Sequence, residues 1–178
     1  GAQVVFDRPG VAERAMYFGT APIWTGGHAS AGATTPSTRW FLAEGATGSY
    51  FTTFVLLANP NDEDASVTLR YLPAAGSTSS GTSSGAPVTR TFTLPARQRA
   101  TRNIATEDDS LASAAVATEV DATLPIVVER AQYWPNPEWF EAHNSFGVTA
   151  AATRWGLAEG RVGGAEGYQT YVLLANTG

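Results

Sequence analysis

Two glutamates, Glu44 and Glu129, are the first candidates for chemistry, because two carboxylates held at the right spacing can hydrolyse a glycosidic bond. Both lie in short motifs that occur twice, so each has a counterpart, Glu159 and Glu13 respectively. A catalytic pair has no reason to be duplicated in this way. Glu44 also precedes a glycine, where a polar turn residue is common, and Glu129 precedes Arg130, a ready ion-pair partner. We therefore predict that the protein is not an enzyme.

Metal chemistry has few candidate ligands in this chain. The two histidines, His28 and His143, occupy equivalent places in a repeated motif, which favours hydrogen-bonded loop histidines over a shared metal site. The run Asn59–Asp64 offers oxygens to calcium, but its counterpart at 176–178 lacks the acids, which favours an acidic turn. Cysteine is absent, so no disulfide, catalytic thiolate or zinc–sulfur site is expected. We expect no metal and no cofactor.

The charge of the chain limits its partners. The net charge is −5, and all eleven basic residues are arginine. Nucleic acid binding depends on basic residues that neutralise phosphates, and membrane-surface binding depends on a basic face. No run of 18 apolar residues occurs, so no membrane-spanning segment is expected. These features exclude nucleic acid and lipid surfaces as predicted partners.

The motifs that contain the candidate glutamates and histidines form an internal repeat at an offset of 115 to 117 positions. This repeat determines how the domain organisation of the chain is interpreted. Each block pairs an early segment with a late one. The pairs are Glu13–Phe18 with Glu129–Trp134, Pro22–Trp24 with Pro137–Trp139, Thr38–Gly45 with Thr153–Gly160, and Phe54–Asn59 with Tyr171–Asn176. Similarity over several blocks in a fixed order is not a chance event.

The order of the blocks predicts three parts. Residues 1–37 match the C-terminal part of a repeat, residues 38–152 form one complete repeat, and residues 153–178 match the N-terminal part of a following repeat. The chain is therefore predicted to be a window on a tandem array.

The complete repeat has the pattern of β-strands. Alternating apolar and polar residues occur at 66–72, 88–94 and 116–120, another strand begins at 126, and 50–58 is apolar on both faces. Gly45 and Gly48 bracket a short connection, which predicts a hairpin between 39–44 and 50–58. Only Asp108 to Ala115 has a helical pattern. The predicted fold is all-β, an immunoglobulin-like β-sandwich flanked by partial repeats.

Aromatic residues have two interpretations. Trp40 and Trp155 lie among apolar neighbours in predicted strands, so we expect both in a core. Other aromatic residues lie in or near a proline-rich loop, where their rings either stack on sugars or pack against a neighbouring repeat. These candidate glycan or repeat-contact aromatics are Trp24, Tyr133, Trp134 and Trp139.

The segment Ala74–Ala86 is rich in Gly, Ser and Thr, which predicts a flexible, exposed loop between strands. A long hairpin connection is the simpler interpretation. Accessible hydroxyls also make it a candidate for O-linked sugars. The candidate residues are Ser77, Thr78, Ser79, Ser80, Thr82, Ser83 and Ser84.

The repeated motifs resemble a tandem repeat of unknown function found in large secreted or surface-attached bacterial proteins, with the signatures VERAxYW, GGHxS, TxWxLAEG and VLLANPN. The residues that carry the resemblance are Glu13–Phe18, Gly26–Ser30, Thr38–Gly48, Val55–Asp62, Val128–Trp134 and Thr153–Gly160. The resemblance implies a secreted or cell-surface location and no catalytic residues. Two places depart from the signatures, at 141–143 and at 161–165, and both concern loop geometry.

These observations predict a non-enzymatic structural module of a bacterial surface stalk or filament. The partial repeats contain apolar strands without the partners of the complete repeat, so neighbouring copies or repeats of the same protein are the expected partners. The alternative is a carbohydrate-binding or adhesion module whose partners are surface glycans. The ends of the sequence also fit a segment cut from a longer polypeptide.

Overall fold

The computed structural model describes residues 1–78, 81–83 and 85–177. Strands dominate these residues, and the helical content is limited to two single 3-10 turns, η1 (Ile104–Thr106) and η2 (Asp109–Leu111). The strands are β1 (Glu13–Thr20), β2 (Ile23–Ala31), β3 (Ser37–Leu42), β4 (Thr52–Ala58), β5 (Ala65–Pro73), β6 (Gly76–Thr78), β7 (Gly81–Ser83), β8 (Val88–Leu94), β9 (Arg99–Asn103), β10 (Val116–Trp134) and β11 (Glu141–Phe146).

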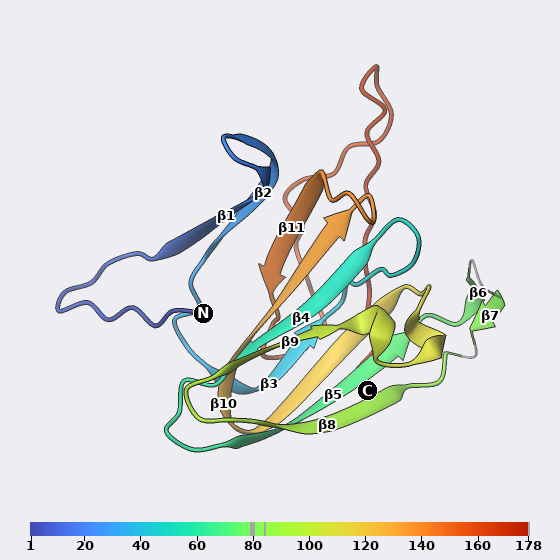
Figure 1. Cartoon of the computed structure of the whole chain (residues 1–178). Coiled ribbons are helices and arrows are strands. Elements are labelled where there is room, and N and C mark those ends of the chain that lie inside the picture. Colours follow the sequence, from blue (N-terminus) through green and yellow to red (C-terminus); the bar gives the residue numbers. More distant parts are fainter. Residues whose placement is uncertain (79–80, 84, 178) are drawn as a thin grey trace.

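The 19-residue strand β10 organises the fold, because its two halves pair with different neighbours. The first half lies between β5 and β3, and the second half lies between β4 and β11, with all pairs antiparallel. Between Asp121 and Ile126 the register with β3 shifts, and the strand passes from one layer to the other there. The result is a curled sheet with two layers, β8-β5-β10-β3 and β9-β4-β10-β11 (Figure 1).

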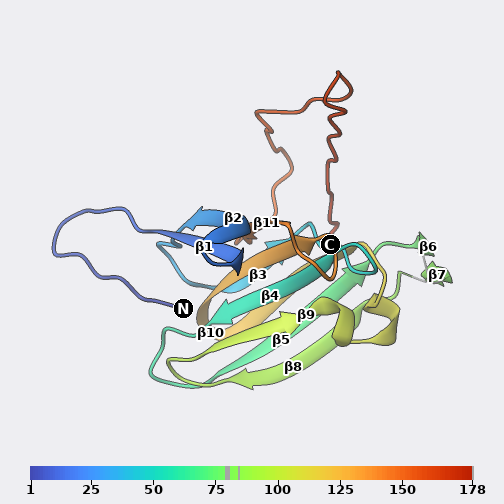
Figure 2. The same cartoon turned by 45° about the horizontal axis from the view of Figure 1, so that its top comes forward.

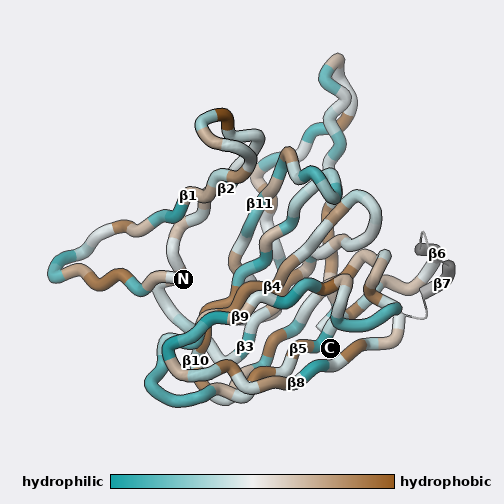
Figure 3. The backbone as a smooth tube through the Cα atoms, viewed as in Figure 1, coloured by the Kyte–Doolittle hydropathy of each residue, from teal (hydrophilic) through white to brown (hydrophobic). Residues whose placement is uncertain are grey.

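The core lies between these layers and follows from the alternation of the strands. On β5, the residues Val67, Leu69 and Tyr71 are fully buried, while the intervening residues are more exposed. Val55 and Leu57 on β4 and Val120 and Val128 on β10 face the same interior. Figure 3 shows the hydrophobic residues along these central strands. The predicted all-β sandwich is confirmed, while the finer assignment to an immunoglobulin-like topology and the division into repeats stay predictions.

Three local expectations were wrong. Segments 39–44 and 50–58 do not pair with each other, because β10 is long enough to supply a separate partner for β3 and for β4. The expected helix at 108–115 is only the turn η2, capped by Asp108 as expected, because Ala115 already forms a bridge to Ala46. Trp40 is buried at 3% exposure, but Trp155 is 61% exposed, since no strand of the described residues pairs with 153–177.

The predicted Ala74–Ala86 loop contains the small hairpin β6–β7, in which Ser77 lies opposite Thr82. Ser79, Ser80 and Ser84 lie outside the described residues, so O-glycosylation of this segment stays a prediction.

Two parts of the chain lie outside the sandwich. The N-terminal hairpin, β1–β2, is a separate two-stranded sheet that lies beside β11 (Figure 2). The C-terminal segment, residues 153–177, projects away from the sandwich and is almost entirely exposed (Figure 1). Neither helical turn in the described residues has the length or apolar character needed to cross a bilayer.

Candidate functional site

A charge cluster is formed by Glu44, Arg130 and His143, with Arg130 buried and the other two side chains partly buried. Arg130 is on the second half of β10, His143 is on β11, and Glu44 follows the end of β3. The Arg130 guanidinium forms an ion pair with the Glu44 carboxylate and donates to His143 Nδ1 at 3.0 Å. His143 Nε2 lies 3.5 Å from the second oxygen of Glu44. The cluster ties the end of β3 to the centre of the β4–β10–β11 layer.

The environment of the cluster determines its protonation. Because an arginine can only donate, His143 Nδ1 accepts, and the Nε2 proton points to Glu44. Burial opposes the charge on Glu44, but the hydrogen bond from His143 and the charge of Arg130 outweigh it and lower the pKa of that carboxyl. Burial lowers the pKa of Arg130, with the charge of Glu44 acting in the opposite direction. An ionised carboxylate therefore faces a charged guanidinium.

This cluster corrects the pairing that adjacency in the sequence suggests. Glu129 and Arg130 are neighbours on a strand, so their side chains point to opposite faces. Arg130 faces the interior and Glu44, whereas Glu129 faces outward and forms an ion pair of 2.9 Å with Arg14 of β1. Both glutamates are thus held by arginines, from different elements. The signal in the sequence was the repeated Glu-Arg-Ala triplet, which contains both arginines.

The N-terminal hairpin reproduces the register of the β10–β11 hairpin. The equivalent cross-strand pairs are Arg14 with Ser30 and Arg130 with Ser145, then Met16 with His28 and Gln132 with His143. Both histidines therefore lie on strands and not in loops, which corrects the expectation for them. Two of the three residues of the charge cluster, the arginine and the histidine, therefore have counterparts at the same positions of the strand register.

The hairpin packs on the outer face of the second half of β10. His28 Nε2 is 3.3 Å from the hydroxyl of Tyr133, and the Phe18 ring meets the Tyr133 ring at 5.6 Å between centroids. Asn144, with its amide nitrogen turned to the hairpin, donates to His28 Nδ1 at 2.8 Å. Burial lowers the pKa of His28 from its ordinary value of 6.5. His28 is therefore held as a neutral imidazole.

The C-terminal segment contains the residues that are buried in β3 and β4, but here they are exposed. Val172 is 59% exposed and Leu174 is 86% exposed, whereas their counterparts Val55 and Leu57 are at 0% and 2%. Leu157, the counterpart of the buried Leu42, is also exposed. The same sequence thus occurs once inside a core and once as an exposed apolar strip.

The C-terminal segment nevertheless keeps the local contacts of β3. The indole nitrogen of Trp40 donates to the carbonyl of Ser37, three residues earlier, at 3.1 Å. Trp155 makes the same contact to the carbonyl of Ala152 at 3.0 Å. Both tryptophans therefore make the same short-range hydrogen bond, although only one of them is packed.

A second pair of contacts is shared across the turn that precedes β4. The hydroxyl of Thr53 accepts from the Ala46 amide at 3.2 Å and donates to the Ala46 carbonyl. The hydroxyl of Thr170 accepts from the Arg161 amide at 2.8 Å and donates to the Arg161 carbonyl at 2.7 Å. The C-terminal segment thus shares this threonine contact with the β3–β4 connection, although no strand pairs with it among the described residues.

The acidic run at 59–64 is organised by the protein itself. The Asn59 amide donates to the carbonyls of Glu63 and Leu94 at 2.8 and 3.0 Å, and Asp62 forms an ion pair of 2.8 Å with Arg97. The Asp64 carboxylate accepts from the Ala96 amide. Within the described ranges, no group of three or more histidine or acidic residues is arranged to hold a metal ion.

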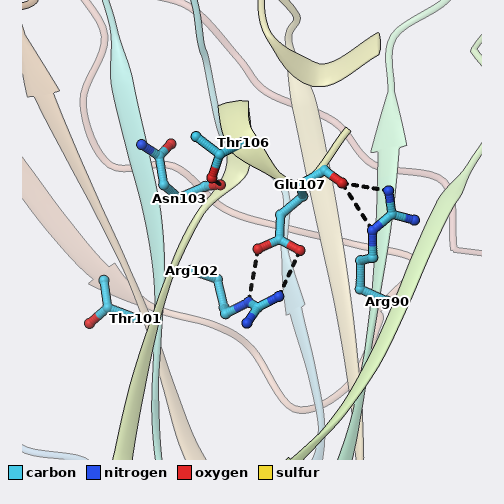
Figure 4. A pocket seen from close by; sticks show the side chains of 6 residues that line it. All are labelled: Arg90, Thr101, Arg102, Asn103, Thr106 and Glu107. Atoms are coloured by element: carbon cyan, nitrogen blue, oxygen red, sulfur yellow. Dashed lines mark hydrogen bonds and ion pairs between the residues drawn. The ribbon is translucent and has the colours of Figure 1, made fainter. Parts of the chain in front are cut away.

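One polar pocket of about 510 Å³ lies at the end of β9, beside η1. Figure 4 shows how its charges are used: the Glu107 carboxylate makes two contacts of 2.8 and 3.0 Å with the Arg102 guanidinium. The Glu107 carbonyl accepts from Arg90 Nε at 2.9 Å, and Arg90 also pairs with Asp108. Both guanidiniums are therefore engaged within the protein.

The predicted aromatic residues are dispersed. Tyr133 is buried and contacts the Trp139 ring at 5.0 Å, and Trp139 has an unusual backbone φ of 52°. Trp134 donates from its indole nitrogen to Glu141 at 2.6 Å. Trp24 is 53% exposed and lies on β2, where its ring contacts Tyr17. The four residues do not form one platform.

Comparisons with known proteins concern the fold. The crystal structure of Thermotoga maritima 1070 is similar with a TM-score of 0.51 at 12% identity, over 65% of this chain and 96% of that one. The Anabaena sensory rhodopsin transducer is similar with a TM-score of 0.44 at 23% identity, over 56% of this chain and 91% of that one. No protein-family model and no curated protein sequence matches the chain. At such identities the first likeness shows the fold alone.

Proposed function

We propose that the protein is a non-enzymatic structural module that assembles end to end, with the C-terminal segment of one copy completing the N-terminal hairpin of another. One observation carries the proposal. The sequence that is buried in β3 and β4 recurs in 153–177, where Trp155, Leu157 and Leu174 are exposed. Apolar strands with a preformed shape favour pairing with a complementary edge.

The edge of β1 supplies a partner of the right kind. β1 is similar in sequence to the second half of β10 and pairs on one side with β2, as β10 pairs with β11. On its other side, β10 pairs with β4, whereas within the described residues no strand lies there on β1. A strand equivalent to β4, such as 170–175, fits this open edge.

Such a contact is heterologous, because the hairpin and the segment are different surfaces of one chain. Repeated head-to-tail contacts produce an open filament unless their rotation closes a ring. Hydrogen bonds between the strands favour association. The burial of large apolar side chains also favours it, with about 1.5–3 kcal/mol for each fully buried side chain. The preformed turn around Thr170 reduces the ordering cost that opposes it.

The proposed location is the bacterial exterior, in a stalk or filament. The resemblance of the repeated motifs to surface repeats supports this part of the proposal. The absence of cysteine is compatible with it, because a sandwich of this size buries enough apolar surface without disulfides.

Sedimentation velocity over a range of concentrations tests the assembly. We expect the wild-type chain to form species larger than a monomer, and the Leu174→Asp variant to remain monomeric because its charge cannot be buried at the junction. Val162→Asp is the matched control, since Val162 is similarly exposed but lies outside the repeated motifs. Equal assembly of wild type and Leu174→Asp contradicts the proposal.

A second candidate function is glycan adhesion, supported by a pair of exposed rings on the N-terminal hairpin. Tyr17 and Trp24 are both more than half exposed, with centroids 6.3 Å apart and planes tilted by 37°. Exposed rings of this kind stack on sugar faces. We expect Trp24→Ala to abolish glycan-array binding if adhesion is the function, with Tyr168→Ala as the control. Unchanged binding refutes this assignment.

A further inference from the structure

We infer that Glu159 of one copy binds Arg14 and His28 of the next, so that the charge cluster of Glu44, Arg130 and His143 is repeated at the junction between copies. The inference rests on the proposed end-to-end assembly and specifies the residues that recognise the partner. It assigns a further function to two partly exposed residues that now contact the sandwich, Arg14 through Glu129 and His28 through Tyr133, and to the exposed Glu159.

The complete cluster supplies the template. Glu44 lies two residues after the end of β3 and reaches Arg130 and His143, which are on adjacent strands. The cluster therefore joins the β3–β4 part of a repeat to its β10–β11 part. Any assembly that brings together the corresponding parts from two copies brings together the corresponding three residues.

The acceptor half of the junction is already in place. Arg14 and His28 lie on β1 and β2 in the same register as Arg130 and His143 on β10 and β11. Arg14 is 44% exposed and now pairs with Glu129, whose side chain is 17% exposed. A guanidinium has five N–H donors, so Arg14 can bind the incoming carboxylate while it keeps its contact with Glu129.

The donor half is also shaped for the contact. Glu159 lies two residues before Arg161, whose backbone is braced by Thr170. Glu44 lies two residues before Ala46, whose backbone is braced in the same way by Thr53. Glu159 is therefore presented by the C-terminal segment at the place that Glu44 occupies in the complete repeat.

The template also predicts the strand register of the junction. Arg130 lies opposite Val55 and Ala131 opposite Phe54 in the β10–β4 pair. The corresponding residues place Arg14 opposite Val172 and Ala15 opposite Tyr171. Because side chains alternate between faces, a shift by one residue turns Val172 away from the interior, and the register is strongly specified.

Two charge-neutralising variants test the carboxylate. We expect Glu159→Gln to raise the concentration needed for half-maximal assembly by at least about tenfold, because it removes the charged partner of Arg14 at the junction. Glu129→Gln is the matched control: it removes the present partner of Arg14, and assembly stays equal or becomes stronger. Circular dichroism verifies that both variants are folded.

The outcomes separate this inference from the proposed function. If the wild type assembles and Glu159→Gln assembles equally well, the carboxylate contact is refuted while end-to-end assembly stands. If Glu129→Gln weakens assembly as much as Glu159→Gln, the specific contact of Glu159 with Arg14 is refuted. If the wild type remains monomeric at all concentrations, both the proposed function and the inference fail.

The register has its own test, because the chain contains no cysteine that would interfere. An Ala15→Cys chain is mixed with a Tyr171→Cys chain under mild oxidation, and the products are separated by mass spectrometry. We expect a disulfide-linked heterodimer, and none when Val172→Cys replaces Tyr171→Cys. The register is contradicted if Val172→Cys forms a disulfide with Ala15→Cys and Tyr171→Cys does not.

Discussion

Replacement of Arg130 by methionine perturbs the centre of the charge cluster while keeping a side chain of similar length. Arg130 is 5% exposed and holds Glu44 and His143 together. In the Arg130→Met variant, the Glu44 carboxylate loses its countercharge in a half-buried position, and His143 Nδ1 loses its donor. The change therefore removes one charge of a buried pair and leaves the other.

The magnitude follows from the burial of the pair. Removal of one partner from a buried ion pair costs about 3–5 kcal/mol, because an uncompensated charge remains. Domains of this kind have a free energy of unfolding of about 5–15 kcal/mol, so the loss is a large fraction of the total. Arg39→Met is the matched control: Arg39 pairs with Asp121 at 3.5 Å with both side chains more than half exposed, and such a pair is worth about 0–1 kcal/mol.

Urea unfolding at neutral pH measures both variants. The expected result is a lower midpoint for Arg130→Met at an unchanged slope, which reports stability and not a change in the unfolded state. The Glu44→Gln, Arg130→Met double variant should lose less than the sum of the single losses, since the two groups interact directly. A loss for Arg130→Met no larger than that for Arg39→Met would refute the reasoning.

The same cluster gives a pH dependence. The folded protein lowers the pKa of Glu44, so the unfolded chain binds a proton first as the pH falls. The stabilisation by Glu44 is therefore complete above its ordinary pKa of about 4.5 and is lost as the pH falls through the lower, folded value. We expect the free energy of unfolding of Glu44→Gln to fall less than that of the wild type as the pH is lowered through this range. An identical acid profile for wild type and Glu44→Gln contradicts the assignment.

Three further predictions concern separate parts of the chain. His28 should titrate by NMR with a pKa below 6.5, so that its stabilising contribution is complete above 6.5 and is lost between 6.5 and the folded pKa; a value at or above 6.5 contradicts the burial argument. Trp40→Ala should cost about 3–5 kcal/mol in urea unfolding, whereas Trp155→Ala should change the stability of the dilute monomer by less than about 0.5 kcal/mol; similar losses contradict the difference in burial. Glu107→Gln should lower the free energy of unfolding by about 1–2 kcal/mol by removing the negative charge and one of the two acceptors that Arg102 contacts, and no change in the midpoint refutes this.

The sequence predicted the features that depend on local pattern. Alternation identified β5 and β8 almost to the residue, and the Thr-Arg-Trp repeat identified which segments are equivalent. The sequence did not predict that β3 and β4 both pair with β10. A short connection can join two strands that pair with each other or two strands in different layers, and no local signal distinguishes these cases. The pairing of Arg130 with Glu44 was missed for the same reason: 86 positions separate them, and only the fold brings them together.

The expected core positions illustrate the limit of pattern. Trp40 and Trp155 have the same neighbours in sequence, and their indoles even make the same local hydrogen bond, yet only Trp40 is buried. Local sequence therefore determines the short-range hydrogen bond of the indole, whereas burial depends on a partner strand. In this chain that partner strand exists for Trp40, since β3 pairs with β10.

The absolute molar mass of the wild-type chain in solution, measured by light scattering across a concentration series, tests the central claim most directly. End-to-end assembly predicts masses well above 18.7 kDa that rise with concentration. A constant mass of 18.7 kDa at every concentration would contradict completion of the N-terminal hairpin by a second copy.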